Sequence, residues 1–207
     1  MTDTTAHWGP RDEARMHAVS RHAAGLFLFV LAAQFMTVVM LAAAMAPGYD
    51  YAQAAISDLG AIPETAMLFN GSLVAVGFLN IVGGVLFWRV HGQLWLLGAF
   101  LIAGLGALGA GFVPLGASDW HGLFALLAFV FFNLQTLGSA VAVKGAMRWL
   151  AGLLGLLGLA YVVVMAIGDA GNPAVFGVFG HGGAERLIVY PPMLWLMALG
   201  GWLMAGR

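Results

Sequence analysis

The chain has 207 residues, of which 62% are hydrophobic and 8% are charged, and its formal net charge is −1. A nearly neutral chain without a basic patch cannot neutralise phosphates, which excludes nucleic acid as a natural partner. The absence of cysteine excludes disulfides, thiolate chemistry and cysteine-ligated metals. This composition is typical of a membrane domain.

The N-terminal segment, residues 1–22, is polar, and we expect a cytoplasmic tail there, in front of a transmembrane domain over residues 23–207. The first apolar stretch ends in Ala44-Met45-Ala46, which has the small-x-small form of a signal-peptidase site. The apolar run is longer than the core of about 7–15 residues found in signal peptides, and Pro47 would follow the cut. We therefore predict an uncleaved membrane anchor.

Six apolar stretches follow one another along the chain, and most match the roughly 20 residues that span a hydrocarbon core. They cover residues 23–45, 66–88, 93–115, 120–143, 149–168 and 187–204. Each is expected to be a helix, because a lone strand would leave its peptide groups unpaired in lipid. The predicted fold class is all-α: a polytopic membrane protein built as a bundle of six transmembrane helices.

The basic residues set the predicted orientation. Seven of the eight Lys and Arg residues fall on one side of the membrane in this topology: Arg11, Arg15, Arg21, Arg89, Lys144, Arg148 and Arg207. The positive-inside rule then places the N- and C-termini in the cytoplasm, and we expect the cell membrane as the location. One Lys against seven Arg, with abundant Ala, Gly and Val, is typical of a bacterium with a GC-rich genome.

Four amide side chains lie near the predicted middle of the membrane: Gln34, Asn80, Asn133 and Gln135. We interpret them as hydrogen-bonding groups between helices, worth about 0.6–2 kcal/mol each. The many glycines of the spans permit close helix approach. No acidic or basic residue accompanies the amides at depth, so a small-solute transporter is the least favoured function.

The remaining charged and imidazole groups map to the outer side. They are Asp50, Asp58, Glu64, Asp119, His121, Asp169, His181, Glu185 and Arg186. The second, fourth and sixth spans all begin on this side, so three helix N-termini present unpaired N–H groups there. If these helices adjoin, they form a polar bowl at the membrane surface that can hold an anionic headgroup.

Several of these residues also have structural interpretations. Ser118 or Asp119 is a natural N-cap for the fourth span, and Asp58 is placed to cap or close a turn. Arg186 is the only outer basic residue, and we predict that it forms a salt bridge with a carboxylate, either Asp58, Asp119 or Glu64. Such a bridge would tie loops together or form part of a ligand site.

The sixth span carries Tyr190-Pro191-Pro192 in its first turns. Proline lacks the N–H and clashes with the carbonyl four residues earlier, so this helix is predicted to begin there or to kink. A kink would free the carbonyls near Leu187 and Ile188.

A metal site is the alternative interpretation of the outer groups. His121, His181 and Asp119 offer nitrogen and oxygen ligands of the kind that zinc accepts, with an open position for water. The sequence contains neither HExxH nor two histidines four residues apart, so the spacing does not favour this alternative.

Short motifs along the chain resemble a known family. They are Ile56-Ser57-Asp58-Leu59-Gly60, Phe69-Asn70-Gly71, Phe112-Val113-Pro114 followed by His121, and Gly182-Gly183-Ala184-Glu185-Arg186 with Trp195. In order and placement they are similar to the prokaryotic membrane family catalogued as domain of unknown function 998. The resemblance implies a six-helix integral membrane protein without an assigned activity. Its characteristic polar positions match Asp58, Asn70, His121, Glu185 and Arg186.

We therefore predict an outward-facing polar site that binds a small ligand or a lipid headgroup without a cofactor. The predicted ligand-binding residues are Asp58, Asn70, Asp119, His121, Glu185 and Arg186. The expected partners are membrane lipid and a small anionic ligand. The alternative function is a metal-dependent hydrolase that acts on lipid at the outer interface.

Overall fold

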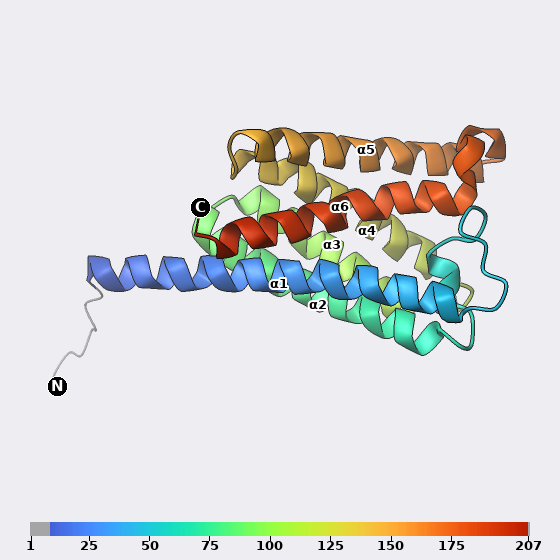
Figure 1. The fold of residues 1–207 in the computed structure, drawn as a ribbon, viewed down its shortest axis with the longest axis horizontal. Coiled ribbons are helices and arrows are strands. Elements are labelled where there is room, and N and C mark those ends of the chain that lie inside the picture. The colour runs from blue at the N-terminus through green and yellow to red at the C-terminus, as the bar shows by residue number, and fades with distance from the viewer. Residues whose placement is uncertain (1–8, 207) are drawn as a thin grey trace.

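The computed structural model describes residues 9–206 of the chain, with the side chain of residue 10 left out. Within that range it contains six long α-helices and no strand (Figure 1). The helices are α1 (Pro10–Met45), α2 (Ala66–His91), α3 (Leu94–Phe112), α4 (Trp120–Gly138), α5 (Ala146–Asp169) and α6 (Gly180–Met204). Three short 3₁₀ helices join them: η1 (Ser57–Gly60), η2 (Ser139–Val141) and η3 (Pro173–Phe179).

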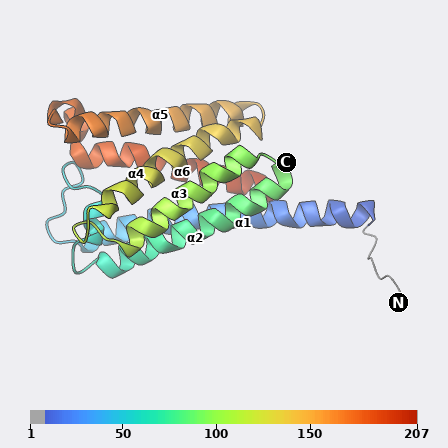
Figure 2. The ribbon, with the colours of Figure 1, turned by 180° about the vertical axis from the view of Figure 1, so that it is seen from behind.

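All six α-helices are long and apolar enough to cross a membrane, which confirms the predicted six-span, all-α fold. α1 passes through residue 22 without a break, and its N-terminal part extends beyond the other helices (Figures 1 and 2). The predicted tail thus falls partly in this helix, and partly in residues 1–8, outside the described range.

The helices form a closed ring. Each α-helix packs against the next one in the chain, α6 packs against α1, and α4 also contacts α6 across the ring. Glycines bring the helices close, as predicted. A side chain on Gly77 of α2 would lie 2.5 Å from the carbonyl oxygen of Gly104 in α3. Because any larger residue would push the two backbones apart, glycine is required at this crossing.

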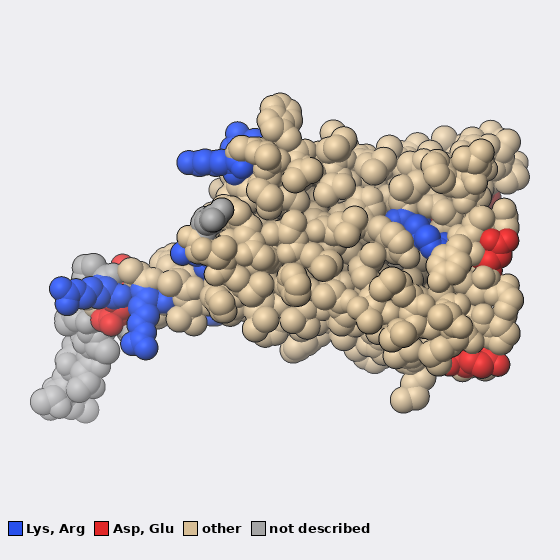
Figure 3. All heavy atoms as spheres, viewed as in Figure 1, with Lys and Arg blue, Asp and Glu red and all other residues tan. Residues whose placement is uncertain are grey.

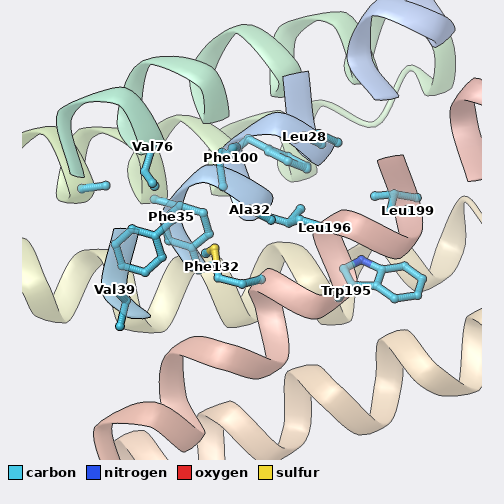
Figure 4. Close-up of a cluster of buried hydrophobic side chains, with 14 of the residues drawn as sticks. Leu28, Ala32, Phe35, Val39, Val76, Phe100, Phe132, Trp195, Leu196 and Leu199 are labelled. Atoms are coloured by element: carbon cyan, nitrogen blue, oxygen red, sulfur yellow. The ribbon is translucent and has the colours of Figure 1, made fainter. Parts of the chain in front are cut away.

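A cluster of large apolar side chains fills the middle of the ring (Figure 4). The labelled members come from five helices: Leu28, Ala32, Phe35, Val39, Val76, Phe100, Phe132, Trp195, Leu196 and Leu199. All of them are buried. The cluster fixes the relative positions of the helices that carry the polar groups described below.

The mid-membrane amides bind one another or the backbone, as predicted. Asn80 of α2 and Gln135 of α4 exchange two amide hydrogen bonds, of 3.1 and 3.0 Å. Asn80 also donates to the carbonyl of Phe100 in α3 at 2.8 Å. Near them, Ser72 donates to Gln34 of α1 at 2.8 Å. These bonds tie four consecutive helices together inside the apolar layer.

Of the two predicted outcomes for the sixth helix, that it begins at its prolines or kinks there, the first is wrong. α6 begins at Gly180 and carries Pro191 and Pro192 in its interior. Pro192 has no N–H for the carbonyl of Ile188, four residues earlier. Asn133 of α4 supplies a donor instead, because its side-chain nitrogen lies 3.0 Å from that carbonyl oxygen. A neighbouring helix therefore restores the bond that proline removes, and α6 continues as one helix.

The charged residues separate along the bundle (Figure 3). On the face shown, Lys and Arg gather at the end where α1 begins, and most of the visible acidic atoms lie at the opposite end. A separate basic patch lies nearer the acidic end. The acidic end is the one where α2, α4 and α6 begin, and it contains the candidate site.

Candidate functional site

A cavity of about 460 Å³ opens at the acidic end of the bundle, between α4, α5, α6 and the segment before α2. We call it the polar cavity. Its polar lining residues are Ser57, Asp58, His121, Asp169, His181 and Glu185. Residues from four separate parts of the chain therefore meet around one space.

A second, smaller cavity of about 70 Å³ reaches toward the centre of the ring, and its walls are mainly apolar. We call it the apolar cavity. The two cavities share six lining residues: Ser57, His121, Ala125, Phe129, Glu185 and Ile188. The two cavities therefore share part of their walls, and the polar side chains of Ser57, His121 and Glu185 belong to this shared part.

The wall before α2 is held by a set of local hydrogen bonds. Asp58 accepts a bond of 2.8 Å from the N–H of Ala55, which closes the turn into η1. Asn70 of α2 donates to the carbonyl of Gly60 at 2.9 Å. A side chain at position 60 would lie 2.5 Å from the Asn70 amide oxygen, so glycine is needed there. Asn70, a predicted ligand-binding residue, supports the wall without lining the cavity, whereas Asp58 both supports the wall and lines the cavity.

Glu185 is buried, with 4% of its surface exposed, although it lies on α6 next to the cavity. Its carboxylate accepts a hydrogen bond from the backbone N–H of Ile56. This bond connects α6 to the segment before α2. Because a buried polar group needs a hydrogen-bond partner, the Ile56 N–H satisfies part of the acceptor capacity of the Glu185 side chain.

His121 lies in the first turn of α4 and is 5% exposed. Its Nδ1 lies 2.7 Å from the carbonyl oxygen of Val113. A carbonyl only accepts, so Nδ1 carries the proton, and Nε2 of the neutral ring is an acceptor. Within residues 9–206 Nε2 has no hydrogen-bond partner, and the ring lines both cavities. His121 is therefore held in one orientation with a free acceptor at the boundary.

His181 and Asp169 lie at the rim of the polar cavity. The His181 Nε2 is 3.2 Å from the Asp169 carboxylate, and both side chains are substantially exposed. The pair joins the end of α5 to the beginning of α6. Asp169 was placed on the outer side by the sequence but was not chosen as a site residue. Asp169 could have been predicted from its position, because the connection between α5 and α6 is short and brings the end of one helix close to the beginning of the other.

The predicted salt bridge of Arg186 is wrong: within residues 9–206, no carboxylate lies within 4 Å of its guanidinium. The guanidinium instead donates to the carbonyls of Gly182 at 2.7 Å, Tyr51 at 2.8 Å and Ala54 at 3.2 Å. The segment before α2 folds back over α6 and aims its carbonyl oxygens at this side chain. Carbonyls can thus take the place of a carboxylate for the terminal nitrogen Nη1 of the guanidinium, whereas its buried Nε has no partner among residues 9–206.

Two tyrosines complete this arrangement, which we call the Arg186 clamp. The guanidinium carbon lies 4.9 Å from the centre of the Tyr51 ring and 5.6 Å from that of Tyr49. The Tyr49 hydroxyl accepts a bond from Arg186 at 2.8 Å and donates to the carbonyl of Ala55 at 2.7 Å. Burial raises the pKa of Tyr49 to about 12, so the hydroxyl remains a donor at neutral pH. Arg186 therefore builds the wall of the polar cavity and does not line it.

Asp119 is exposed and lies outside both cavities. It occupies the N-cap position of α4 without a side-chain capping bond, and the N–H of Trp120 instead donates to Ser118 at 3.3 Å. The described part of the chain contains no group of three or more His, Asp or Glu arranged to hold a metal ion. His121, His181 and Asp119 are thus not gathered into a common site.

Of the six predicted ligand-binding residues, Asp58, His121 and Glu185 line the polar cavity, and Asn70 and Arg186 support its wall. The fold and these features define a multi-pass helical membrane protein with a polar cavity at one end. Residues 17–202 match the family described as protein of unknown function (DUF998), and the chain belongs to that family. No curated protein and no solved structure gives a match to it.

Proposed function

We propose that this protein binds a membrane amphiphile at the non-cytoplasmic surface of the cell membrane. The headgroup occupies the polar cavity and the beginning of the chain enters the apolar cavity. The observation that carries the proposal is the shared wall of the two cavities, in which His121 and Glu185 stand at the polar–apolar boundary. An amphiphile has the same boundary between its headgroup and its chain.

The dimensions support this proposal. Ligand pockets usually measure about 300–1,000 Å³, and the polar cavity, at about 460 Å³, falls within that range. The apolar cavity of about 70 Å³ has room for only a short part of a chain. Because lipid tails are as apolar as leucine side chains, moving a chain from the bilayer into this cavity changes the free energy little. Selection must therefore come from the headgroup.

The location follows from the charge distribution. Of the described Lys and Arg residues, only Arg186 lies near the end that holds the polar cavity. The positive-inside rule assigns that end to the non-cytoplasmic side. The cavity then lies at the depth of lipid headgroups, where an amphiphile can enter from the bilayer.

The proposal is tested by closing the polar cavity. Gly122 lies in the cavity wall, and a Cβ added there meets no atom within 4 Å. Gly122→Phe therefore adds a ring at the cavity wall without a steric clash at its Cβ. Gly71 is the matched control, since it is an exposed glycine near the start of α2 with equally open space and lies outside both cavities.

Native mass spectrometry of the purified protein in neutral detergent measures which membrane amphiphiles remain bound. We expect a bound species in the wild type and in Gly71→Phe, and its loss in Gly122→Phe. Equal occupancy by the same species in Gly122→Phe would mean that the cavity is not the binding site.

A further inference from the structure

We propose that the headgroup bound in the polar cavity is a cation, most simply a primary ammonium. This inference rests on the proposed function and specifies its ligand. The polar cavity has three carboxylate side chains in its walls, from Asp58, Asp169 and Glu185, and the described lining contains neither Lys nor Arg. An anionic headgroup would meet carboxylates there without a fixed positive charge to offset them.

The expectation of an anionic ligand depended on Arg186, but the Arg186 clamp holds this cation away from the cavity lining. Arg186 follows Glu185 in α6, yet its guanidinium is bound by the carbonyls of Tyr51 and Gly182 and does not line the cavity. Glu185 is buried beside it without an ion pair in the described range. The Ile56 N–H thus reaches Glu185 from the backbone, and the described lining of the cavity adds His181 but neither Lys nor Arg.

His121 provides a second and independent indication. Its ring is 95% buried, since only 5% of its surface is exposed, and Nδ1 is fixed on the carbonyl of Val113. Nε2 has no partner among residues 9–206 and presents an acceptor where the two cavities meet. An acceptor fixed in the cavity wall favours a ligand that donates a hydrogen bond to it. A primary ammonium has three N–H donors and no acceptor, as in lysine, which matches carboxylates and an imidazole nitrogen together.

The experiment compares three amphiphiles with the same chain: dodecylammonium, dodecanol and dodecanesulfonate, with ethylammonium as the short-chain amine. Each is titrated into the protein in neutral detergent micelles, and native mass spectrometry gives the bound fraction. We expect dodecylammonium to bind at least tenfold more tightly than dodecanol, which corresponds to about 1.4 kcal/mol. Dodecanesulfonate should bind more weakly than dodecanol.

Two double variants distinguish the effect of carboxylates in the cavity from the effect of carboxylates elsewhere on the surface. Glu185→Gln with Asp58→Asn removes two carboxylates from the cavity but keeps an oxygen for the N–H groups of Ile56 and Ala55. Glu64→Gln with Asp119→Asn makes the same charge change at two exposed positions outside the cavity. We expect the first pair to reduce the ammonium preference to less than twofold and the second pair to leave it unchanged.

If the first pair does not fold, Asp169→Asn serves instead, because this exposed rim residue has no bond to the segment before α2. It should lower the ammonium preference at least threefold. An equal or greater affinity for dodecanol or dodecanesulfonate would overturn the cationic headgroup while leaving amphiphile binding intact. If ethylammonium binds as tightly as dodecylammonium, the cavity selects a cation as inferred, but the proposal that the ligand is an amphiphile is refuted. Binding of none of the four, with Gly122→Phe indistinguishable from the wild type, would refute both proposals.

Discussion

Replacing Arg186 tests whether backbone carbonyls, and not a carboxylate, hold the segment before α2 against α6. Arg186→Ala removes the bonds to the Tyr51 carbonyl and the Tyr49 hydroxyl, both 2.8 Å long. Charge-assisted hydrogen bonds contribute about 1.5–3 kcal/mol each, and partial exposure of the guanidinium favours the low end. Stacking on the tyrosine rings adds about 0.5–1 kcal/mol. The expected loss in the free energy of unfolding is therefore about 3–4 kcal/mol.

The decisive comparison is with Arg186→Lys. A lysine keeps the charge but cannot contact several carbonyls and two rings at fixed angles. We expect it to recover less than half of the lost stability, whereas a simple ion pair would be largely recovered. The free energy of unfolding is measured by titration with SDS in mixed micelles, with Arg148→Ala as control. Arg148 is exposed and donates to nearby carbonyls at 3.2 and 3.4 Å, so its loss should cost no more than about 0.5 kcal/mol. A loss below about 1 kcal/mol for Arg186→Ala, or full recovery by lysine, would refute the clamp.

Two further predictions concern the bundle as a whole. Reporter domains fused after Trp88 and after Gly116 should lie on opposite sides of the membrane, with the first in the cytoplasm; two reporters on the same side would contradict the six-span topology. Asn80→Leu should lower the free energy of unfolding by about 0.6–2 kcal/mol, since it strands the Gln135 amide. Adding Gln135→Leu should cost much less than the single Gln135→Leu change does, and full additivity in SDS titrations would show that the two amides are uncoupled.

The six helices and the hydrogen bonds of their Asn and Gln side chains could be predicted from the sequence, because both depend on position along a helix. Apolar length predicts a span, and an amide at mid-span needs a partner that lipid cannot supply. Asn80 and Gln135 therefore behave as predicted. Asp119 lies at the N-cap of α4, as the sequence predicted, but its side chain does not line the cavity.

The partners of Arg186 were not accessible in the same way. Backbone carbonyls are present at every residue, so the sequence has no sign that those of Tyr51 and Ala54 turn toward this side chain. The beginning of α6 was mistaken for a similar reason. The glycines at its beginning allow the backbone of the segment before α2 to lie against the helix, where the Gly182 N–H donates to the carbonyl of Ala52 at 2.9 Å. The proline positions were then the remaining signal for a helix start.

Among residues 9–206, the ring of helices closes through contact between α6 and α1, which are the last and the first of the six helices in chain order. During membrane insertion a chain that ends before α6 lacks both Glu185 and the Ile188 carbonyl that receives a bond from Asn133. Such a chain exposes an incompletely bonded amide and an open seam along α1 to lipid. The insertion of α6 therefore completes both the ring and the wall of the cavity. Truncated or slowly inserted chains should carry a polar mark inside the bilayer that membrane quality control can recognise.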